Sequence, residues 1–257
     1  MTLQYDGTDY HGWQVQPNGV TLQEILQEKI KGLTGEDAQV TGAGRTDAGV
    51  HALGQVASFK TWSKLAPDTV KRALNAVLPG AIRIVDACDA GEAFHPRYDA
   101  KSKVYFYIIS NTYTISPFLY KYAWRIPQKL DSDRMRRALA PLEGTHDFSA
   151  FRASGCGAKN PVRTISRISV EKLSGLDFMG AKLDGSFIKI SLEADAFLRH
   201  MVRNIVGAAV EAGKGKITPG DMEIILESKD RKRAGPTAPA RGLFLEKVIY
   251  ETENPES

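Results

Sequence analysis

The sequence predicts an α+β protein. Segments typical of strands and of helices follow one another along the 257 residues without the regular βαβ alternation of a doubly wound sheet. Apolar residues make up 42% and charged residues 25% of the chain, which is ordinary for a folded protein and argues against disorder. A chain of this length can bury about 70–75% of its unfolded surface, so one large domain or two smaller ones should support themselves.

The first hundred residues begin with a turn-rich segment and are then expected to alternate between helices and strands. A helix should start after Thr21, because Thr21 and Glu24 stand in capping-box relation and apolar residues recur at helical spacing from Leu22 to Leu33. Gly35 fits the end of this helix. The pattern then predicts a strand at 56–59, a helix at 67–78 and a strand at 81–88.

The rest of the chain is less regular. The run Val104 to Ile109 consists of strong β-formers and predicts a strand, whereas 147–167 reads as a loop. Further strands are expected at 168–173, 187–195 and 243–251, and helices at 131–142, 197–213 and 217–228. We expect an N-terminal half at 1–103 and a C-terminal half at 104–257, with a frayed acidic tail at 251–257.

Composition excludes several classes of protein. Two cysteines, Cys88 and Cys156, cannot form a disulfide framework or a four-thiolate zinc site, and a reducing compartment such as the cytoplasm is the simplest expectation. The first residues lack the basic and apolar regions of a signal peptide, and no run approaches the about 20 apolar residues of a membrane helix. The net charge of +4 is too small to identify a nucleic-acid binder by itself.

Common catalytic motifs fail when tested. Gly42 and Gly44 start a G-x-G-x-x-G pattern, but its sixth position is Asp47, which would repel a pyrophosphate. No G-K-[ST] follows a glycine-rich loop, and the five histidines form no zinc-binding signature. Ser154 does not lie in a G-x-S-x-G elbow. Hydride transfer, phosphoryl transfer and zinc-dependent chemistry are therefore disfavoured.

The glycine-rich segment 42–55 is the remaining candidate for chemistry. Arg45 and Asp47 lie two residues apart, so both side chains leave the same face if the segment is extended. An aspartate beside an arginine should stay ionised below its usual pKa of about 3.9, and an oriented carboxylate can act as a nucleophile or base. Residue types alone nevertheless favour the structural alternative, an ion pair that pins a loop.

Longer motifs point to one family. The run GAGRTDAGVHALGQVASF resembles the active-site signature of the tRNA pseudouridine synthase A family. Similar to the family's other blocks, in the same order, are YDGTDYHGWQVQP, FHPRYDAKSKVYFY, GTHDFSAFRASG, FLRHMVRNIVGAAVEAGKGK and APARGLFLEKVIY. The resemblance covers nearly the whole chain. It implies the pseudouridine synthase fold, in which two RRM- or ferredoxin-like halves share a mostly antiparallel sheet with a central cleft.

The resemblance also implies roles for five residues. Asp47 matches the catalytic nucleophile, and Arg45 matches an arginine that helps to extrude the target base and fills its place. Tyr105 matches the tyrosine that stacks on the base. Arg203 matches the basic residue that pairs with the catalytic carboxylate, and Leu245 an apolar residue of the uracil pocket.

Each of these residues also has a structural interpretation. Taken alone, Tyr105 would be assigned to the core or a sheet face, Arg203 to a charged surface and Leu245 to a buried strand. His51 and His200 are expected to be structural or RNA-facing rather than catalytic, because the sequence suggests no partner for them.

The activity implied by the resemblance is isomerisation of uridine to pseudouridine in the anticodon stem-loop of tRNA, at nucleotides 38, 39 or 40. No group or electron enters or leaves, so the reaction demands no cofactor and no metal. Family membership further implies a homodimer. The sequence leaves open which of these uridines react, and whether Asp47 attacks the base or the sugar.

Two basic stretches could contact RNA. Residues 148–167 contain four basic and no acidic residues, and residues 229–241 contain five basic residues and one acidic. Flexible basic loops suit phosphate contacts on a folded RNA, although an isolated charge run is more often a solvated surface.

Three rival functions stay open. The chain could be a related synthase for another RNA uridine, a non-catalytic tRNA-binding factor or an enzyme for a small molecule. The combined presence of Asp47 and the other matched residues disfavours the binding factor, since an RNA-binding surface has no need of a carboxylate. The two basic stretches disfavour the small-molecule enzyme.

Overall fold

The computed structural model describes residues 1–251 and divides the chain into two compact units. The first unit comprises residues 1–103 together with the chain from Phe244 onward, and the second comprises Val104–Leu243. The last strand thus belongs to the first unit, whereas the expected halves placed it with 104–257. The expected fraying at 251–257 concerns residues that, beyond 251, lie outside the described part. Both units combine helices with mostly antiparallel strands, which confirms the α+β class.

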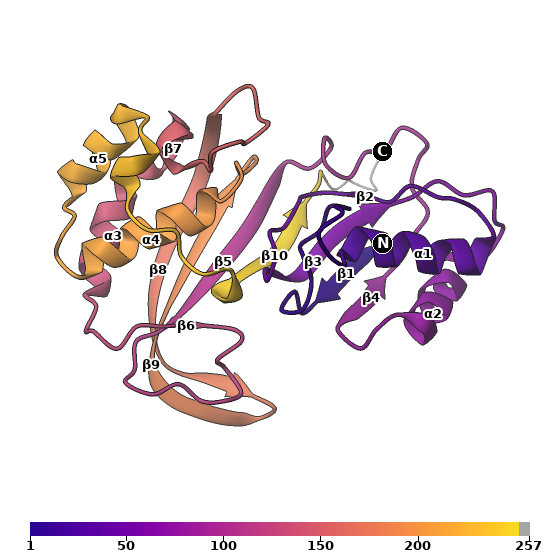
Figure 1. The fold of residues 1–257 in the computed structure, drawn as a ribbon, viewed down its shortest axis with the longest axis horizontal. Coiled ribbons are helices and arrows are strands. Elements are labelled where there is room, and N and C mark those ends of the chain that lie inside the picture. Colours follow the sequence, from indigo (N-terminus) through magenta and orange to yellow (C-terminus); the bar gives the residue numbers. More distant parts are fainter. Residues whose placement is uncertain (252–257) are drawn as a thin grey trace, which may run out of the picture. The chain divides into compact units, whose positions relative to one another are not determined.

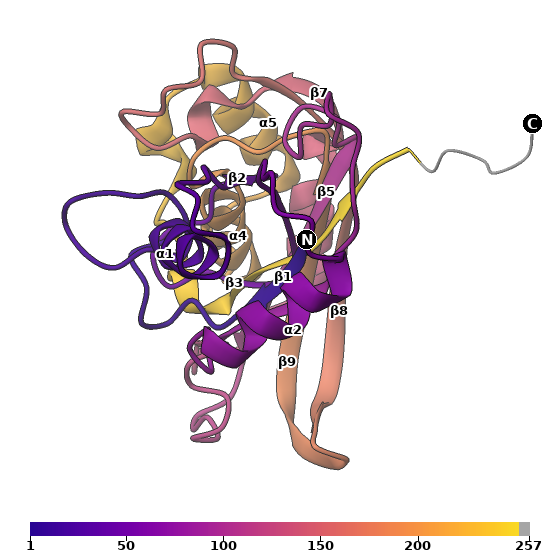
Figure 2. The same ribbon diagram turned by 90° about the vertical axis from the view of Figure 1, so that its right-hand side faces the viewer.

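The first unit has its strands in the order β4-β1-β3-β10, with β2 also paired to β3. Strand β1 is antiparallel to both β3 and β4, and β10 is parallel to β3. Figures 1 and 2 show α1 and α2 beside these strands. The elements are β1 (Thr2–Tyr5), α1 (Leu22–Thr34), β2 (Thr41–Gly42), β3 (His51–Ser58), α2 (Pro67–Val77), β4 (Ile82–Asp86) and β10 (Leu243–Ile249).

Local signals explain the first helix. The Thr21 side chain accepts a hydrogen bond from the Glu24 amide at 3.4 Å, as the predicted N-cap requires. Gly35 ends α1 with φ of 76°, a conformation that favours glycine, and its N–H donates to the Lys31 carbonyl. The apolar face is buried, so the predicted helix is confirmed at both ends.

The second unit has its strands in the order β5-β9-β8-β7, with β6 parallel to β5. Strands β8 and β9 form a long antiparallel hairpin, clearly visible in Figure 1. The strands are β5 (Ser102–Ser110), β6 (Trp124–Arg125), β7 (Gly144–Asp147), β8 (Val162–Phe178) and β9 (Ala181–Ala194). The helices are α3 (Ser132–Leu139), α4 (Met201–Gly213) and α5 (Pro219–Ser228), with 3₁₀ turns η1 (Ala140–Leu142), η2 (Phe148–Phe151), η3 (Arg231–Ala234) and η4 (Ala240–Gly242).

Several predicted boundaries in this unit are wrong. The strands expected at 168–173 and 187–195 are longer, since β8 continues to Phe178 and β9 begins at Ala181. Residues 162–167 were expected in a loop, but they begin β8, where Thr164 pairs with Thr145 of β7 and Arg167 with Glu193 of β9. The helix expected from residue 197 starts at Met201, because His200 has φ of 61° and breaks the helical path. Within residues 1–251 no helix has both the length and the apolar character that a membrane crossing needs.

Candidate active site

The segment 43–50, which connects β2 to β3, is anchored by its carbonyl oxygens. The Trp13 amide donates to Thr46 O at 3.0 Å, and Gln55 Nε2 donates to Gly44 O at 2.7 Å. Both donors belong to buried residues, so these bonds are partly shielded from water. The backbone that carries the motif GRTD is therefore held by the interior of the first unit.

Thr46 determines where its charged neighbours point. Its hydroxyl lies 2.8 Å from the Tyr5 hydroxyl in the interior, and Thr46 is only 7% exposed. Arg45 is exposed and Asp47 is half-buried. This alternation agrees with an extended segment in which Arg45 and Asp47 leave the side opposite Thr46.

Burial changes the ionisation of Tyr5. It raises the pKa of the Tyr5 hydroxyl to about 12, although hydrogen bonds with Thr46 and Gln55 act in the other direction. The tyrosine is therefore neutral at any physiological pH. Its role is to hold Thr46 and not to exchange protons with a substrate.

The turn-rich start of the chain packs closely against the same segment. Gly12 has φ of 87°, and a Cβ there would lie 2.6 Å from Thr46 O. A Cβ on Gly42 would lie 2.6 Å from the ring of Trp13, which is almost fully buried. These glycines are required because backbone and ring approach where a side chain would stand. Trp13 accordingly serves packing.

His51 is buried inside the first unit. Its ring stacks on Phe244 with centroids 4.6 Å apart. Its Nδ1 lies 3.1 Å from Asp6 Oδ1 and accepts a hydrogen bond from Gly7 N at 3.1 Å. With 1% of its surface exposed, His51 fits the structural role better than an RNA-facing one.

Leu245 is fully buried on β10, opposite Ala52 of β3. The parallel pairing of these strands depends on Gly54, where a Cβ would lie 2.6 Å from Glu246 O. Arg45, Asp47 and Leu245 thus belong to the first unit.

Tyr105 lies on β5 of the second unit and is almost fully buried. Its ring meets that of Phe197 nearly at right angles, with centroids 5.1 Å apart. Tyr107 lies on the same face of the strand, since it is two residues on, and its hydroxyl donates to Pro239 O at 2.8 Å. Burial raises the pKa of Tyr107.

Arg203 is half-buried on α4 and does not behave as a simple surface charge. Its Nε donates to Ala238 O at 2.8 Å, while Ala238 N donates back to Arg203 O at 3.0 Å. The bond from Nε orients the guanidinium, and the backbone bond holds α4 against the chain at Ala238. One turn further along α4, a Cβ on Gly207 would lie 1.7 Å from Pro236 O, so the helix and the chain at 236–238 are in direct contact.

The basic stretches are more ordered than expected. Arg163 and Arg167 lie on β8, and the stretch 229–241 contains η3 and η4. Lys229 Nζ also forms an ion pair with Asp147 Oδ2 at 3.0 Å. Although burial opposes ionisation, hydrogen bonds from Ser149 and the pairing with Lys229 lower the pKa of Asp147.

Sequence reasoning missed the residues that hold the Asp47 segment. Tyr5 and Gln55 both stand inside matched motifs, but nothing in the sequence shows that their side chains reach Thr46 and Gly44. Only Thr46 could have been found, because it stands between the two charged residues and must point inward if they point outward.

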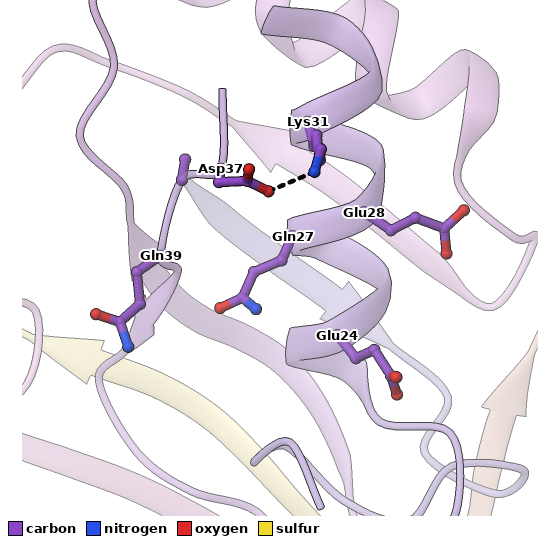
Figure 3. Close-up of a pocket in the computed structure, with 7 residues that line it drawn as sticks. Glu24, Gln27, Glu28, Lys31, Asp37 and Gln39 are labelled. Atoms are coloured by element: carbon purple, nitrogen blue, oxygen red, sulfur yellow. Dashed lines mark ion pairs between the residues drawn. The ribbon is translucent and has the colours of Figure 1, made fainter. Parts of the chain in front are cut away.

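One pocket of the described residues contains none of the predicted site residues. It has a volume of about 450 Å³ and lies beside α1, and Figure 3 shows the ion pair of Lys31 with Asp37 at its edge. Its lining is Glu24, Gln27, Glu28, Lys31, Asp37, Ala38 and Gln39. Three carboxylates against one lysine would repel RNA phosphates. In the described chain, no cluster of three or more His, Cys, Asp or Glu side chains is arranged to hold a metal ion.

Comparison with known proteins gives consistent matches. A family model described as tRNA pseudouridine synthase matches residues 1–99 and 138–251. The chain is 47% identical over 250 residues to tRNA pseudouridine synthase A of Thermoanaerobacter sp. (strain X514), covering 97% of this chain and 98% of that protein. It is 45% identical to the protein of the same name from Thermodesulfovibrio yellowstonii over 97% and 98% of the two chains, and to that from Myxococcus xanthus over 99% and 92%.

Proposed function

As a member of the tRNA pseudouridine synthase A family, this chain isomerises uridine in tRNA to pseudouridine, and we propose that it acts in the anticodon stem-loop, just 3′ of the anticodon, with Asp47 as the nucleophile. The observation that carries this proposal is the anchoring of Asp47. Its segment has the motif GRTD, and its backbone is fixed by Trp13, Gln55 and the Tyr5–Thr46 pair. A carboxylate on a fixed backbone needs little reorganisation to reach a reacting atom.

The chemistry explains why a carboxylate is needed. The C1′–N1 bond of uridine breaks, the detached base turns, and C5 bonds to C1′. C5 then loses its proton and N1 gains one, so the product has the same composition as the substrate. The Asp47 carboxylate attacks either C1′ of the sugar or C6 of the base, and both routes end at the same product.

The other matched residues act on the target base. Flipping a base out of a helix costs a few kcal/mol, and Arg45 offsets this by filling the gap. Tyr105 stacks on the uracil, which is worth about 1–3 kcal/mol per base. Leu245 supplies an apolar wall that lets the free base turn, and Arg203 pairs with the catalytic carboxylate. The basic stretches at 148–167 and 229–241 contact the tRNA backbone.

The test replaces the nucleophile by its nearest neutral analogue. Asp47→Asn keeps the shape of the side chain and removes its charge, so the variant should bind tRNA as the wild type does and form pseudouridine roughly 10⁴- to 10⁶-fold more slowly. Asp89→Asn makes the same charge change at an exposed residue of the first unit and should retain full activity. Substantial pseudouridine formation by a folded Asp47→Asn protein would contradict the proposed role of Asp47.

Two rivals lead to different outcomes. A related synthase for another RNA uridine would leave nucleotides 38–40 unmodified in the tRNA of a deletion strain complemented with this chain. A binding factor would bind tRNA but yield no pseudouridine.

We further propose a cytoplasmic homodimer, and light scattering of the purified protein should give twice the mass of one chain.

A further inference from the structure

Asn204 is a buried polar side chain that the mechanism above does not use. It is fully buried on α4, directly after Arg203. Its Nδ2 donates to Phe151 O at 2.7 Å. Its Oδ1 accepts from Arg231 Nη2 at 2.9 Å and from Thr237 Oγ1 at 2.7 Å. A buried amide with partners at both ends can hold two separate segments together.

The partners of Asn204 come from two basic segments. Phe151 ends η2 and immediately precedes residues 152–161, here called the first basic loop. Arg231 and Thr237 lie within residues 229–241, the second basic loop. A second link, between Lys229 and Asp147, joins the same two regions. The two loops are therefore neighbours within the second unit, and Asn204 lies where they meet.

Six of the seven basic residues of these loops fall into two groups. Arg231 is used inside the protein, since it also donates to Gly235 O at 2.7 Å and to Thr237 Oγ1 at 2.8 Å, and Lys229 is paired with Asp147. Four others make no side-chain hydrogen bond or ion pair within residues 1–251: Arg152, Lys159, Lys232 and Arg233. Two of these come from each loop. The first group shapes the surface, and the second can meet an external anion.

We propose that Asn204 is a positioning residue that fastens the two basic loops into one surface for the phosphate backbone of tRNA. This inference rests on the proposed function, because tRNA is the anion that the surface would bind. RNA phosphates suit the arrangement, since each loop offers two cations. Arg231 and Lys229 maintain the shape of this surface through their contacts with Asn204 and Asp147.

An Asn204→Asp substitution tests the link selectively. The carboxylate can still accept from Arg231 and Thr237, but it has no donor for Phe151 O, and oxygen would face oxygen there. The second loop should therefore keep its position while the first loop, still held by the hydrogen bond from Ala153 N to Arg199 O at 2.9 Å, is loosened. The logarithm of the binding constant for tRNA falls as the logarithm of the salt concentration rises, and the steepness of this fall is here called the salt slope. Loss of the Arg152 and Lys159 contacts would reduce the salt slope by about 0.7–0.9 for each contact.

The experiment measures tRNA affinity at several salt concentrations, together with KM and kcat. For Asn204→Asp we expect a salt slope lower by about 1–2 and a several-fold rise in Kd and KM, larger than any change in kcat. Ile205→Val, at a buried neighbour on the same helix, is the control for mild destabilisation and should keep the wild-type slope. An unchanged slope in folded Asn204→Asp, or an equal fall in Ile205→Val, would overturn the inference.

A milder variant covers the case in which Asn204→Asp does not fold. Thr237→Val removes one of the two donors to Asn204 Oδ1 and should lower the salt slope by a smaller amount, whereas a wild-type slope would overturn the inference. A wild-type enzyme that neither binds nor modifies tRNA would overturn the proposed function and this inference with it. An active wild type with unchanged variants would overturn the inference alone.

Discussion

Replacing Thr46 by valine should leave the Tyr5 hydroxyl buried without a good partner. It would lose its 2.8 Å hydrogen bond with Thr46 and keep only the 3.5 Å contact from Gln55 Nε2. Valine has the shape of threonine, so no cavity forms and the cost is that of an unsatisfied buried hydroxyl, about 1–3 kcal/mol. Removing both hydroxyls, in Tyr5→Phe with Thr46→Val, leaves nothing unsatisfied between them and should cost less than the sum of the single changes.

Urea unfolding of the wild type, both single variants and the double variant measures this directly. We expect a coupling free energy of about 1–2 kcal/mol between Tyr5 and Thr46. Single effects that add to within about 0.5 kcal/mol would refute the claim that this pair anchors the segment. Thr46→Val should also lower kcat, because Asp47 is the next residue. A loss of stability with unchanged kcat would show that the Tyr5–Thr46 pair does not position Asp47 for catalysis.

Three further predictions follow from buried contacts. Burial raises the pKa of Tyr5 from 10.0 to about 12, so the unfolded protein loses this proton first and the free energy of unfolding should fall by up to about 2.7 kcal/mol as the pH rises from 10 to 12. The Tyr5→Phe variant should lack this fall. The same dependence of the free energy of unfolding on pH in both proteins would contradict the prediction. Gly207→Ala places a methyl group against Pro236 O and should cost about 1–3 kcal/mol and weaken tRNA binding, whereas wild-type values in urea unfolding and filter binding would show that this contact is unimportant. Leu245→Ala should cost about 2–5 kcal/mol in urea unfolding and Leu245→Met less than about 1.5, and equal costs would argue against a tightly packed site.

The sequence predicts best where the signal is local. The start and end of α1 depend on residues within one turn of each boundary, Thr21 with Glu24 and Gly35 with Lys31. The motif that singles out Asp47 as a candidate is likewise made of its immediate neighbours, and the role of Asp47 stays a prediction. In each case the physical cause lies within a few residues of the effect, so reading along the chain is enough.

Non-local pairing explains the boundaries that were wrong. The run from Val162 to Arg167 carries polar and basic residues after a proline, which is typical of a loop. It is a strand because β7 and β9 offer hydrogen-bonding edges on its two sides, and neither edge is visible in the run itself. The late start of α4 depends on the positive φ angle at His200, which cannot be predicted from the residue type.

Charge counting also has a physical limit. The second basic loop looked like a uniform patch of cations, but a count cannot distinguish Arg231, whose guanidinium bonds to Asn204, from Lys232, whose side chain reaches solvent. The difference lies in the partners that the fold supplies. The part of the loop that can bind RNA is therefore smaller, and better positioned, than the sequence suggested.

The most direct test of the central claim is the release of tritium from tRNA labelled at C5 of uridine, because the C5 proton leaves only when C5 bonds to C1′. Wild-type protein should release tritium in proportion to the uridines just 3′ of the anticodon, and should do so in the presence of a metal chelator. Absence of release from every tRNA tested would contradict the account and would favour a tRNA-binding factor without catalytic activity.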